Sequence, residues 1–309
     1  MAKIFIDGSS GTTGLRIRER LSERKDIKII TIDENLRHDT EARKNAINTS
    51  DISFLCLPDD VAKEAVSLVD NNKTVIIDTS TAHRTNNEWT YGFPEISDFR
   101  ERIKTSKRIA NPGCHASGFI ALVSPLVSNG LLRSDANLSC FSLTGYSGGG
   151  KKMISEYESG HVNTMLNGPR QYALSQNHKH LGEMKKICKI KNYPIFCPIV
   201  APFFSGMEVT VPVFKSDLNG TFKDIEEIYS SVYNCKTVHY DRNSDENGFM
   251  SASAFSGRDD MQISIFGNDD RILLISRFDN LGKGASGSAI QNMNIILGTE
   301  ETKGLITEV

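Results

Sequence analysis

The sequence lacks the cysteine and histidine patterns of metal sites and disulfide frameworks. Its six cysteines are scattered, no Cys-x-x-Cys pair occurs, and no histidines cluster at the spacing of metal ligands. We therefore expect reduced thiols and no bound metal.

Long apolar runs and a large net charge are absent too. No stretch of roughly 18 apolar residues occurs, and Met1-Ala2-Lys3 leads directly into a strand pattern instead of a basic and then apolar leader. The net charge is −2, from 36 basic and 38 acidic residues. These features predict a cytoplasmic or organelle-matrix protein with neither a membrane nor a nucleic acid as partner.

The patterns that are present predict two domains. The chain has 309 residues, which is more than one hydrophobic core usually supports. Apolar runs at residues 51–57 and 75–78 flank a helical pattern at residues 61–69, which predicts a Rossmann-type, doubly wound parallel sheet of the α/β class. Longer strand patterns follow residue 114, at residues 138–144, 209–214, 261–266 and 272–278. They predict a second, α+β domain with a mixed or antiparallel sheet.

The N-terminus has the pattern of a dinucleotide site. A strand at residues 3–7 leads into a glycine-rich turn at residues 8–14 and then into a helical pattern at residues 15–21. Gly8 permits a tight turn, Gly11 lets the backbone approach a pyrophosphate, and Gly14 allows the helix to pack closely on the strand. The predicted cofactor-binding residues are Gly8, Ser10, Gly11, Thr12, Thr13, Gly14, Arg37, Pro58 and Ser80.

The choice between NAD and NADP stays open at this point. The second strand pattern, residues 27–33, ends in Asp33, and an acid there usually binds the ribose hydroxyls of NAD. Arg37 follows closely, and a basic side chain near that strand end can hold the 2′-phosphate of NADP.

Cys114 is the candidate nucleophile. Pro112 and Gly113 form a turn before an apolar helical pattern that includes residues 119–123, so Cys114 is predicted in the first turn of a helix. Unpaired backbone N–H groups and the helix dipole stabilise a thiolate at that position. The alternative is a buried cysteine without chemistry, which is common for free thiols.

The order and spacing of several motifs resemble the N-acetyl-gamma-glutamyl-phosphate reductases, particularly their shorter form, which are related to the aspartate-semialdehyde dehydrogenases. The motifs lie at residues 8–14, 78–84, 91–95, 111–114, 144–150, 178–180 and 279–284. The resemblance implies a Rossmann domain at residues 1–113 and a catalytic and oligomerisation domain at residues 114–284. The C-terminal segment 285–309 would complete the first domain with a helix at residues 285–297. The resemblance also implies a homodimer or homotetramer.

The resemblance implies a reaction of arginine biosynthesis. NADPH would reduce N-acetyl-L-glutamyl 5-phosphate to the 5-semialdehyde through a thioester on Cys114. His178 and His180 would complete the catalytic group, with His178 favoured for proton transfer, and Tyr172 has the family's spacing to them. The implied substrate-binding residues are Arg84, Asn111, Tyr146, Ser147 and Gly148.

Two histidines need separate interpretation. His115 is next to Cys114, but neighbours on a helix point about 100° apart, so we interpret His115 as structural. His83 stands where the family usually has an acidic or aromatic residue, which leaves the role of that loop undetermined.

Two alternatives remain for the function. An aspartate-semialdehyde dehydrogenase would use the same nucleophile and cofactor, although the His178-Lys179-His180 segment argues against it. A dinucleotide-binding sensor would retain the fold without chemistry. Cys114 together with a histidine pair argues against the sensor.

Overall fold

The computed structural model describes residues 1–160 and 163–307. Contacts between Cα atoms divide the chain into two compact units. Unit 1 comprises residues 1–94, 98–112 and 285–305. Unit 2 comprises residues 95–97 and 113–284 and the chain from residue 306 on.

A few residues lie in a different unit from the predicted one. Residues 95–97, Gly113 and Ile306 belong to unit 2, although all of them fall within the predicted first domain. Backbone pairing explains the position of Ile306, because the Asp259 N–H donates to its carbonyl at 2.7 Å and the Ile306 N–H donates to Asp259 Oδ2 at 2.9 Å. The last two residues of the predicted segment 285–309 lie outside the described residues.

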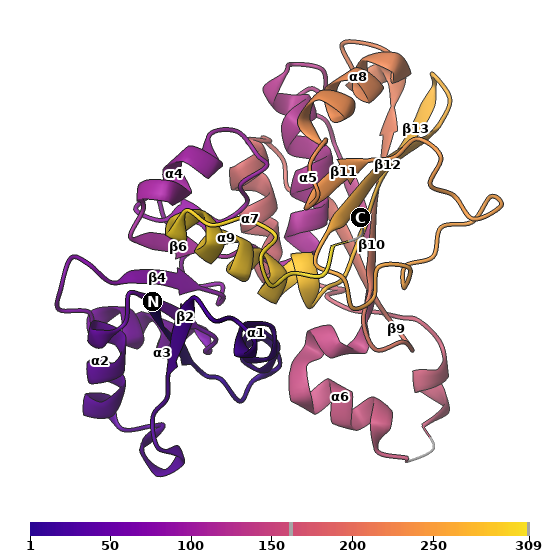
Figure 1. The fold of residues 1–309 in the computed structure, drawn as a ribbon. Coiled ribbons are helices and arrows are strands. Elements are labelled where there is room, and N and C mark those ends of the chain that lie inside the picture. The colour runs from indigo at the N-terminus through magenta and orange to yellow at the C-terminus, as the bar shows by residue number, and fades with distance from the viewer. Residues whose placement is uncertain (161–162, 308–309) are drawn as a thin grey trace. The chain divides into compact units, whose positions relative to one another are not determined.

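Unit 1 contains a six-stranded parallel sheet with the order β2-β1-β3-β4-β6-β5 (Figure 1). Its strands are β1 (Ala2–Asp7), β2 (Ile27–Ile30), β3 (Ile52–Leu55), β4 (Val75–Asp78), β5 (Thr90–Tyr91) and β6 (Arg108–Ala110). The direction of the strand order changes at β1, so the topological switch point lies between β1 and β3. Doubly wound sheets bind their ligands at that point.

Helices cover both faces of this sheet. Ile4 and Ile6 of β1 lie in one buried cluster, and Phe5 between them lies in another, as the alternation of side chains along a strand requires. The first cluster includes residues of α1 (Thr12–Ser22), α4 (Phe99–Thr105) and α9 (Gly287–Leu297), and the second includes residues of α2 (Thr40–Thr49) and α3 (Asp59–Ser67). The doubly wound α/β fold predicted from the sequence is confirmed.

The C-terminal helix α9 completes the core of unit 1. Ala289, Ile290 and Met293 are fully buried in the same cluster as Ile4. The Asn292 side chain also donates from Nδ2 to the Gly92 carbonyl at 2.9 Å.

This helix is expected over residues 285–297 of the segment 285–309, and its observed end is the expected one, while its start is two residues later. A π-helical turn at Gly282–Ser286 precedes α9, and the helix ends at Leu297. Gly298 then adopts φ 65°, a left-handed conformation that ends helices readily when the residue is glycine.

Unit 2 contains a seven-stranded mixed sheet with the order β11-β12-β13-β10-β7-β9-β8. The pairs β7–β9 and β11–β12 are parallel and the other pairs are antiparallel. Its strands are β7 (Ser139–Gly145), β8 (Arg170–Gln171), β9 (Ile195–Ala201), β10 (Met207–Phe214), β11 (Val238–Tyr240), β12 (Met261–Gly267) and β13 (Arg271–Phe278). The predicted mixed sheet of the second domain is confirmed.

Helix α5 (Cys114–Ser128) packs on one face of this sheet. A glycine allows the close approach, because a Cβ on Gly118 would lie 2.4 Å from Val209 Cγ2 of β10. Two further helices, α7 (Lys179–Cys188) and α8 (Phe222–Val232), pack against α5, while α6 (Gly150–Glu158) follows β7. No helix within residues 1–160 and 163–307 is both long enough and apolar enough to cross a membrane.

A proline inside α5 changes its hydrogen bonding. Pro125 has no N–H to donate to the Ala121 carbonyl one turn earlier. The buried Tyr233 hydroxyl of the chain after α8 donates to that carbonyl at 2.6 Å, and the Tyr229 hydroxyl of α8 donates to the adjacent Leu122 carbonyl at 2.6 Å. The hydroxyls of Tyr229 and Tyr233 thus bind two consecutive carbonyls of α5, and the Tyr233 hydroxyl donates to the one to which Pro125 cannot donate.

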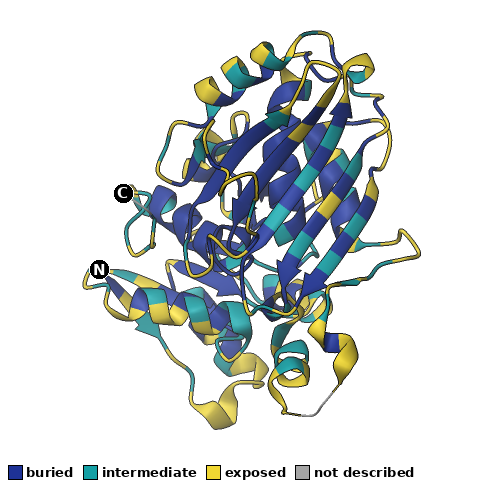
Figure 2. Cartoon of the chain, turned by 90° about the vertical axis from the view of Figure 1, so that its right-hand side faces the viewer, coloured by how far each residue is buried: buried dark blue, intermediate teal, exposed yellow. Residues whose placement is uncertain are grey.

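The opposite face of the seven-stranded sheet carries apolar side chains that are partly exposed (Figure 2). Phe141, Ile195 and Leu273 are 43%, 60% and 40% exposed on three different strands. Leu143 and Ile199, which are paired across β7 and β9, are half-buried on the same face. We call these five residues the open sheet face.

Candidate active site

The turn after β1 has the close approaches expected of a pyrophosphate site. Gly8 has φ 82°, and a Cβ there would lie 2.3 Å from the Cys56 carbonyl oxygen. A Cβ on Gly14 would lie 2.5 Å from the Gly8 carbonyl oxygen, so α1 starts closer to β1 than any side chain would allow. Gly11 is the N-cap of α1. Because glycine has no capping side chain, the N–H groups of Thr12, Thr13 and Gly14 can face an anion, which fits a dinucleotide.

The chain after β2 departs from the sequence interpretation. β2 ends at Ile30, so Asp33 does not end a strand. Asp33 is instead the N-cap of a single 3-10 turn, where its carboxylate accepts the Asn35 N–H at 2.9 Å. Arg37 is half exposed, forms an ion pair with Glu34 and donates from Nε to His38 at 3.2 Å.

The ends of β3 and β4 hold the two other predicted cofactor residues. Pro58 is the N-cap of α3, which begins two residues earlier than the predicted range 61–69. Ser80 is buried, and both its hydroxyl, at 2.7 Å, and its N–H, at 2.9 Å, donate to the Asp78 carboxylate. Asp78 also lies 2.6 Å from His83 Nδ1, and the His83 ring stacks on Trp89 with 4.0 Å between centroids.

Two predicted substrate-binding residues of unit 1 have internal partners. Arg84 donates to the backbone carbonyls of Thr79 and Asn111, each at 2.8 Å. The Asn111 side chain is fully buried, donates to the Ala285 carbonyl at 2.9 Å and accepts from Asn292 at 3.3 Å. The burial of Asn111 argues against direct substrate contact by its side chain.

Cys114 is the first residue of α5, as the sequence predicted. The N–H of the preceding Gly113, the N-cap, donates at 2.8 Å to Oε1 of Glu183, a buried residue of α7. A Cβ on Gly284 would lie 2.9 Å from Cys114 Cβ. Glu183 and Gly284 therefore fix the backbone and the packing of the nucleophile, and sequence reasoning assigned a role to neither.

A cluster of aromatic rings surrounds the start of α5. The His115 ring lies 5.9 Å from His178 and 5.5 Å from His180, measured between centroids, and His178 lies 4.8 Å from His180. Tyr172 joins the cluster through a bond of 2.7 Å between its hydroxyl and His115 Nε2. Phe196 of β9 packs against His115 and His178. The sequence interpretation treated His115 as structural and separate from the two catalytic histidines. In the structure, His115 instead lies in the middle of the cluster that contains them.

The two predicted catalytic histidines have different exposure. His178 is half-buried and is the N-cap of α7, where its Nδ1 accepts the His180 N–H at 3.2 Å. His180 is 5% exposed. Burial lowers the pKa of His178, and the Lys179 ammonium lowers it further, so His178 is neutral at neutral pH.

The remaining predicted substrate residues lie in the 3-10 turn after β7. The backbone N–H groups of Tyr146 and Ser147 donate to the carbonyls of Phe203 and Phe204, at 2.9 and 3.0 Å. The Ser147 hydroxyl accepts from Asn280 at 3.0 Å. The backbone N–H groups of Tyr146 and Ser147 are therefore occupied within the protein, whereas Gly148 is exposed.

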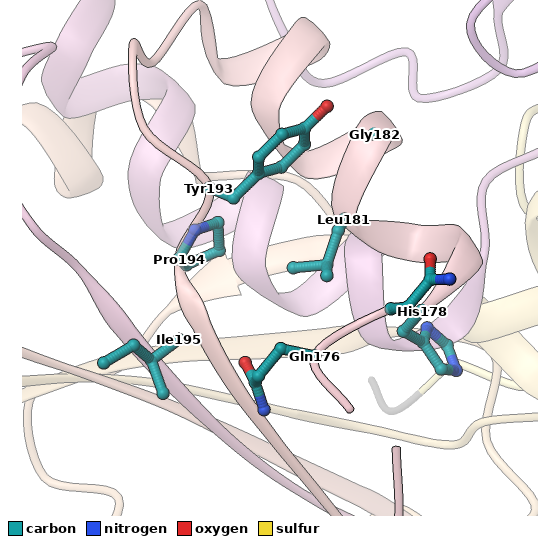
Figure 3. Close-up of a pocket in the computed structure, with 8 residues that line it drawn as sticks. Gln176, His178, Leu181, Gly182, Tyr193, Pro194 and Ile195 are labelled. Carbon is teal, nitrogen blue, oxygen red and sulfur yellow. The ribbon is translucent and has the colours of Figure 1, made fainter. Parts of the chain in front are cut away.

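A pocket of about 460 Å³ borders His178 (Figure 3). Its wall combines polar and apolar side chains of α7, the segment before it and the segment that leads into β9. The lining residues are Gln176, Asn177, His178, Leu181, Gly182, Tyr193, Pro194 and Ile195. Among the residues that the structure describes, no group of three or more His, Cys, Asp or Glu could hold a metal ion.

Comparisons with known proteins define the class. A family model described as semialdehyde dehydrogenase, NAD binding domain, matches residues 28–106, and one described as semialdehyde dehydrogenase, dimerisation domain, matches residues 114–280. Aspartate semialdehyde dehydrogenase II of Vibrio cholerae, complexed with ASA, has a TM-score of 0.72 at 15% identity over 96% of this chain and 98% of its own. The enzyme of Candida albicans with NADP has a TM-score of 0.67 at 14% identity over 96% and 99%. The fold and both domains are those of a semialdehyde dehydrogenase-type oxidoreductase.

The relatives with higher sequence identity indicate a particular family within this class. N-acetyl-gamma-glutamyl-phosphate reductase 2 of Nostoc sp. is 41% identical over 98% of this chain and 99% of its own length. N-acetyl-gamma-glutamyl-phosphate reductase of Brucella ovis is 43% identical over 96% of this chain and 99% of its own length. The chain belongs to the N-acetyl-gamma-glutamyl-phosphate reductase family, as its motifs indicated.

Proposed function

We propose that this enzyme reduces N-acetyl-L-glutamyl 5-phosphate to N-acetyl-L-glutamate 5-semialdehyde and phosphate in arginine biosynthesis. The observation that carries the proposal is the position of Cys114 at the N-terminus of α5, beside a cluster of His115, Tyr172, His178 and His180. The names of the relatives supply the substrate class.

Cys114 is the proposed nucleophile. Its thiolate attacks the acyl carbon, a C–S bond forms, and the bond between that carbon and the phosphate oxygen breaks, so that phosphate leaves with the electron pair. A bound nicotinamide dinucleotide supplies the hydride that reduces the thioester carbon. The C–S bond of the resulting thiohemiacetal then breaks, which releases the aldehyde and restores the Cys114 thiolate.

His178 is the proposed proton carrier in these steps. Because its Nδ1 accepts the His180 N–H, a neutral His178 carries its proton on Nε2. From Nε2 it can give a proton to the substrate oxygen that gains charge and take it back when the thiohemiacetal collapses. His180 is more deeply buried and positions His178 through this backbone bond.

NADP(H) is the proposed cofactor. Gly8, Ser10, Gly11, Thr12, Thr13 and Gly14 would hold the pyrophosphate, with Pro58 and Ser80 at the next strand ends. Arg37 would bind the 2′-phosphate, since its present partner Glu34 forms only an exposed ion pair of about 0–1 kcal/mol. Arg84, Tyr146 and Gly148 remain the proposed substrate contacts.

A homodimer and a cytoplasmic location complete the proposal. The open sheet face carries partly exposed apolar side chains on the neighbouring strands β7 and β9 and on β13, a feature typical of a surface that a second copy covers. The description of the second matching family model as a dimerisation domain supports the same conclusion.

The experiment that tests the function measures absorbance at 340 nm in the reverse direction. The enzyme is given phosphate, NADP or NAD, and either N-acetyl-glutamate 5-semialdehyde or aspartate semialdehyde. We expect phosphate-dependent NADPH formation with the acetylated aldehyde only. Turnover with aspartate semialdehyde only would instead identify an aspartate-semialdehyde dehydrogenase, and no turnover with any combination would indicate a non-catalytic sensor.

A further inference from the structure

A chain of hydrogen bonds leads from β7 to the aromatic cluster. Ser142 Oγ lies 2.7 Å from His115 Nδ1, and His115 Nε2 lies 2.7 Å from the Tyr172 hydroxyl. Ser142 is fully buried and His115 is 3% exposed, so the bond between them is shielded from water, while the bond to Tyr172 is partly buried. None of the steps proposed for Cys114 and His178 requires these two hydrogen bonds.

The chain can run in only two directions. Burial lowers the pKa of His115 to about 3, with a smaller effect from His178, so the imidazole is neutral and has one donor and one acceptor nitrogen. When the Ser142 hydroxyl donates to Nδ1, the Nε2–H donates to the Tyr172 oxygen, and the Tyr172 proton is available to a further acceptor. In the opposite direction, the His115 Nδ1–H donates to Ser142 Oγ and the Tyr172 hydroxyl donates to Nε2.

Negative charge on Cys114 favours the first direction of the two hydrogen bonds, in which the Tyr172 hydroxyl accepts from His115 and keeps its own proton for another acceptor. Burial raises the pKa of Tyr172, and negative charge on Cys114 raises it further, so the phenol stays protonated beside a Cys114 thiolate. Cys114 and His115 are neighbours in the first turn of α5, and the Tyr172 hydroxyl is therefore held at the same helix end as the sulfur. An O–H dipole close to a thiolate is most stable when its proton points at the sulfur.

We propose that Ser142 and His115 are positioning residues that fix the Tyr172 hydroxyl as a hydrogen-bond donor to the Cys114 thiolate. This inference rests on the proposed function for the role of Cys114 as the nucleophile. A hydrogen bond to the charged form lowers the pKa of a thiol, so the three residues together increase the fraction of Cys114 that can attack at neutral pH.

The test is the rate at which iodoacetamide alkylates Cys114 at pH 7, followed by mass spectrometry of the peptide that contains it. We expect Tyr172→Phe to slow alkylation about threefold, because a rise of one pKa unit lowers the thiolate fraction about tenfold and raises its nucleophilicity about threefold. His115→Leu should slow alkylation by the same factor. His115→Gln should retain the rate, since its side-chain amide can donate from the position of Nε2.

The double variant separates positioning from general packing. In the Tyr172→Phe background, His115→Leu should slow alkylation no further, because His115 acts only through the missing hydroxyl. Matched controls are Tyr240→Phe and His239→Leu on β11, which should alkylate at the wild-type rate. Circular dichroism of each variant reports whether it folds.

Two results would overturn the inference. One is a wild-type alkylation rate in a folded Tyr172→Phe variant, and the other is an equal effect of His115→Leu with and without the Tyr172 hydroxyl. Should His115→Leu not fold, Ser142→Ala takes its place, with the expectation of slower alkylation that disappears in the Tyr172→Phe background. Alkylation needs no substrate, so its outcome is independent of whether the enzyme turns over the acetylated aldehyde.

Discussion

At the scale of single residues, Cys114 differs from the buried cysteines of its own unit. Burial raises the pKa of Cys140 and of Cys188 far above the ordinary value, which leaves both thiols protonated and inert. Cys114 instead combines partial exposure with a helix N-terminus, where N–H groups stabilise negative charge. The three side chains are chemically the same, so the burial and the backbone around each thiol determine which one can react.

Replacing the nucleophile should separate chemistry from cofactor binding. We expect Cys114→Ala to lower turnover by at least about three orders of magnitude, because no other group can form the thioester. The affinity for NADPH should stay at the wild-type value, since the glycine-rich turn and Cys114 belong to different units of the chain. Fluorescence titration with NADPH checks this, and a folded variant with weaker binding would contradict the assignment.

His115 should make the stability of the enzyme depend on pH. Its pKa is about 3 in the folded chain and about 6.5 in an unfolded one, chiefly because of burial, so only the unfolded chain takes up the proton between these values. Stability is therefore complete above pH 6.5 and falls as the pH falls toward 3. From pH 7 to pH 5 the loss from this group is about 2 kcal/mol.

The measurement is urea unfolding of the wild type and of His115→Gln at both pH values. The variant lacks the titrating group, so its stability should fall by about 2 kcal/mol less than that of the wild type over the same range. Equal losses in both proteins would show that His115 is not the group responsible.

The candidate catalytic residues could be proposed from the sequence, but not all of their partners could. The helix position of Cys114 followed from Pro112 and Gly113, because their effect on the backbone is local. Glu183 and Gly284 could not be found in this way, since their contacts with residues 113 and 114 join distant parts of the chain. For His115 the angle between helix neighbours was correct, but several elements meet at a helix end, so its ring still packs against His178.

At the scale of secondary-structure elements, two tyrosine hydroxyls join α5 to α8 and the residue after it, and Tyr233 is the one bonded to the carbonyl that Pro125 leaves without its helical donor. Tyr233→Phe should destabilise the enzyme by about 1–3 kcal/mol, because the buried Ala121 carbonyl already lacks the N–H of Pro125 and would also lose the Tyr233 hydroxyl. Tyr193→Phe is the control, since that side chain is 58% exposed and should have little effect. Thermal melting compares the two, and equal melting temperatures would contradict the role of the hydroxyl.

The elements themselves were largely predictable from their apolar patterns. Residues 75–78 were predicted as a strand and form β4 with the same bounds. The end of β2 was wrong by three residues, because Ile32 continues the apolar pattern while the Asp33 carboxylate binds the backbone and starts a turn. Local side-chain bonds of this kind compete with strand pairing and leave no trace in hydrophobic periodicity.

At the scale of the whole molecule, the open sheet face predicts assembly. If the proposed homodimer forms through this face, Phe141→Asp should convert it into a monomer, because a charge among apolar side chains that a second copy covers loses its hydration without gaining a partner. Phe249→Asp is the matched control, since Phe249 is 77% exposed and lies outside the strands. Sedimentation velocity distinguishes the two states, and an unchanged dimer in Phe141→Asp would place the interface elsewhere.

The position of α9 has a consequence for synthesis on the ribosome. Residues 113–284 are contiguous and can fold as soon as they have left the exit tunnel, but the sheet of unit 1 must wait for residues 287–297 to cover the cluster that includes Ile4, Phe54 and Ile77. The part of the chain that is translated first is therefore the part that is finished last. During that interval its uncovered apolar surface is a natural binding site for chaperones.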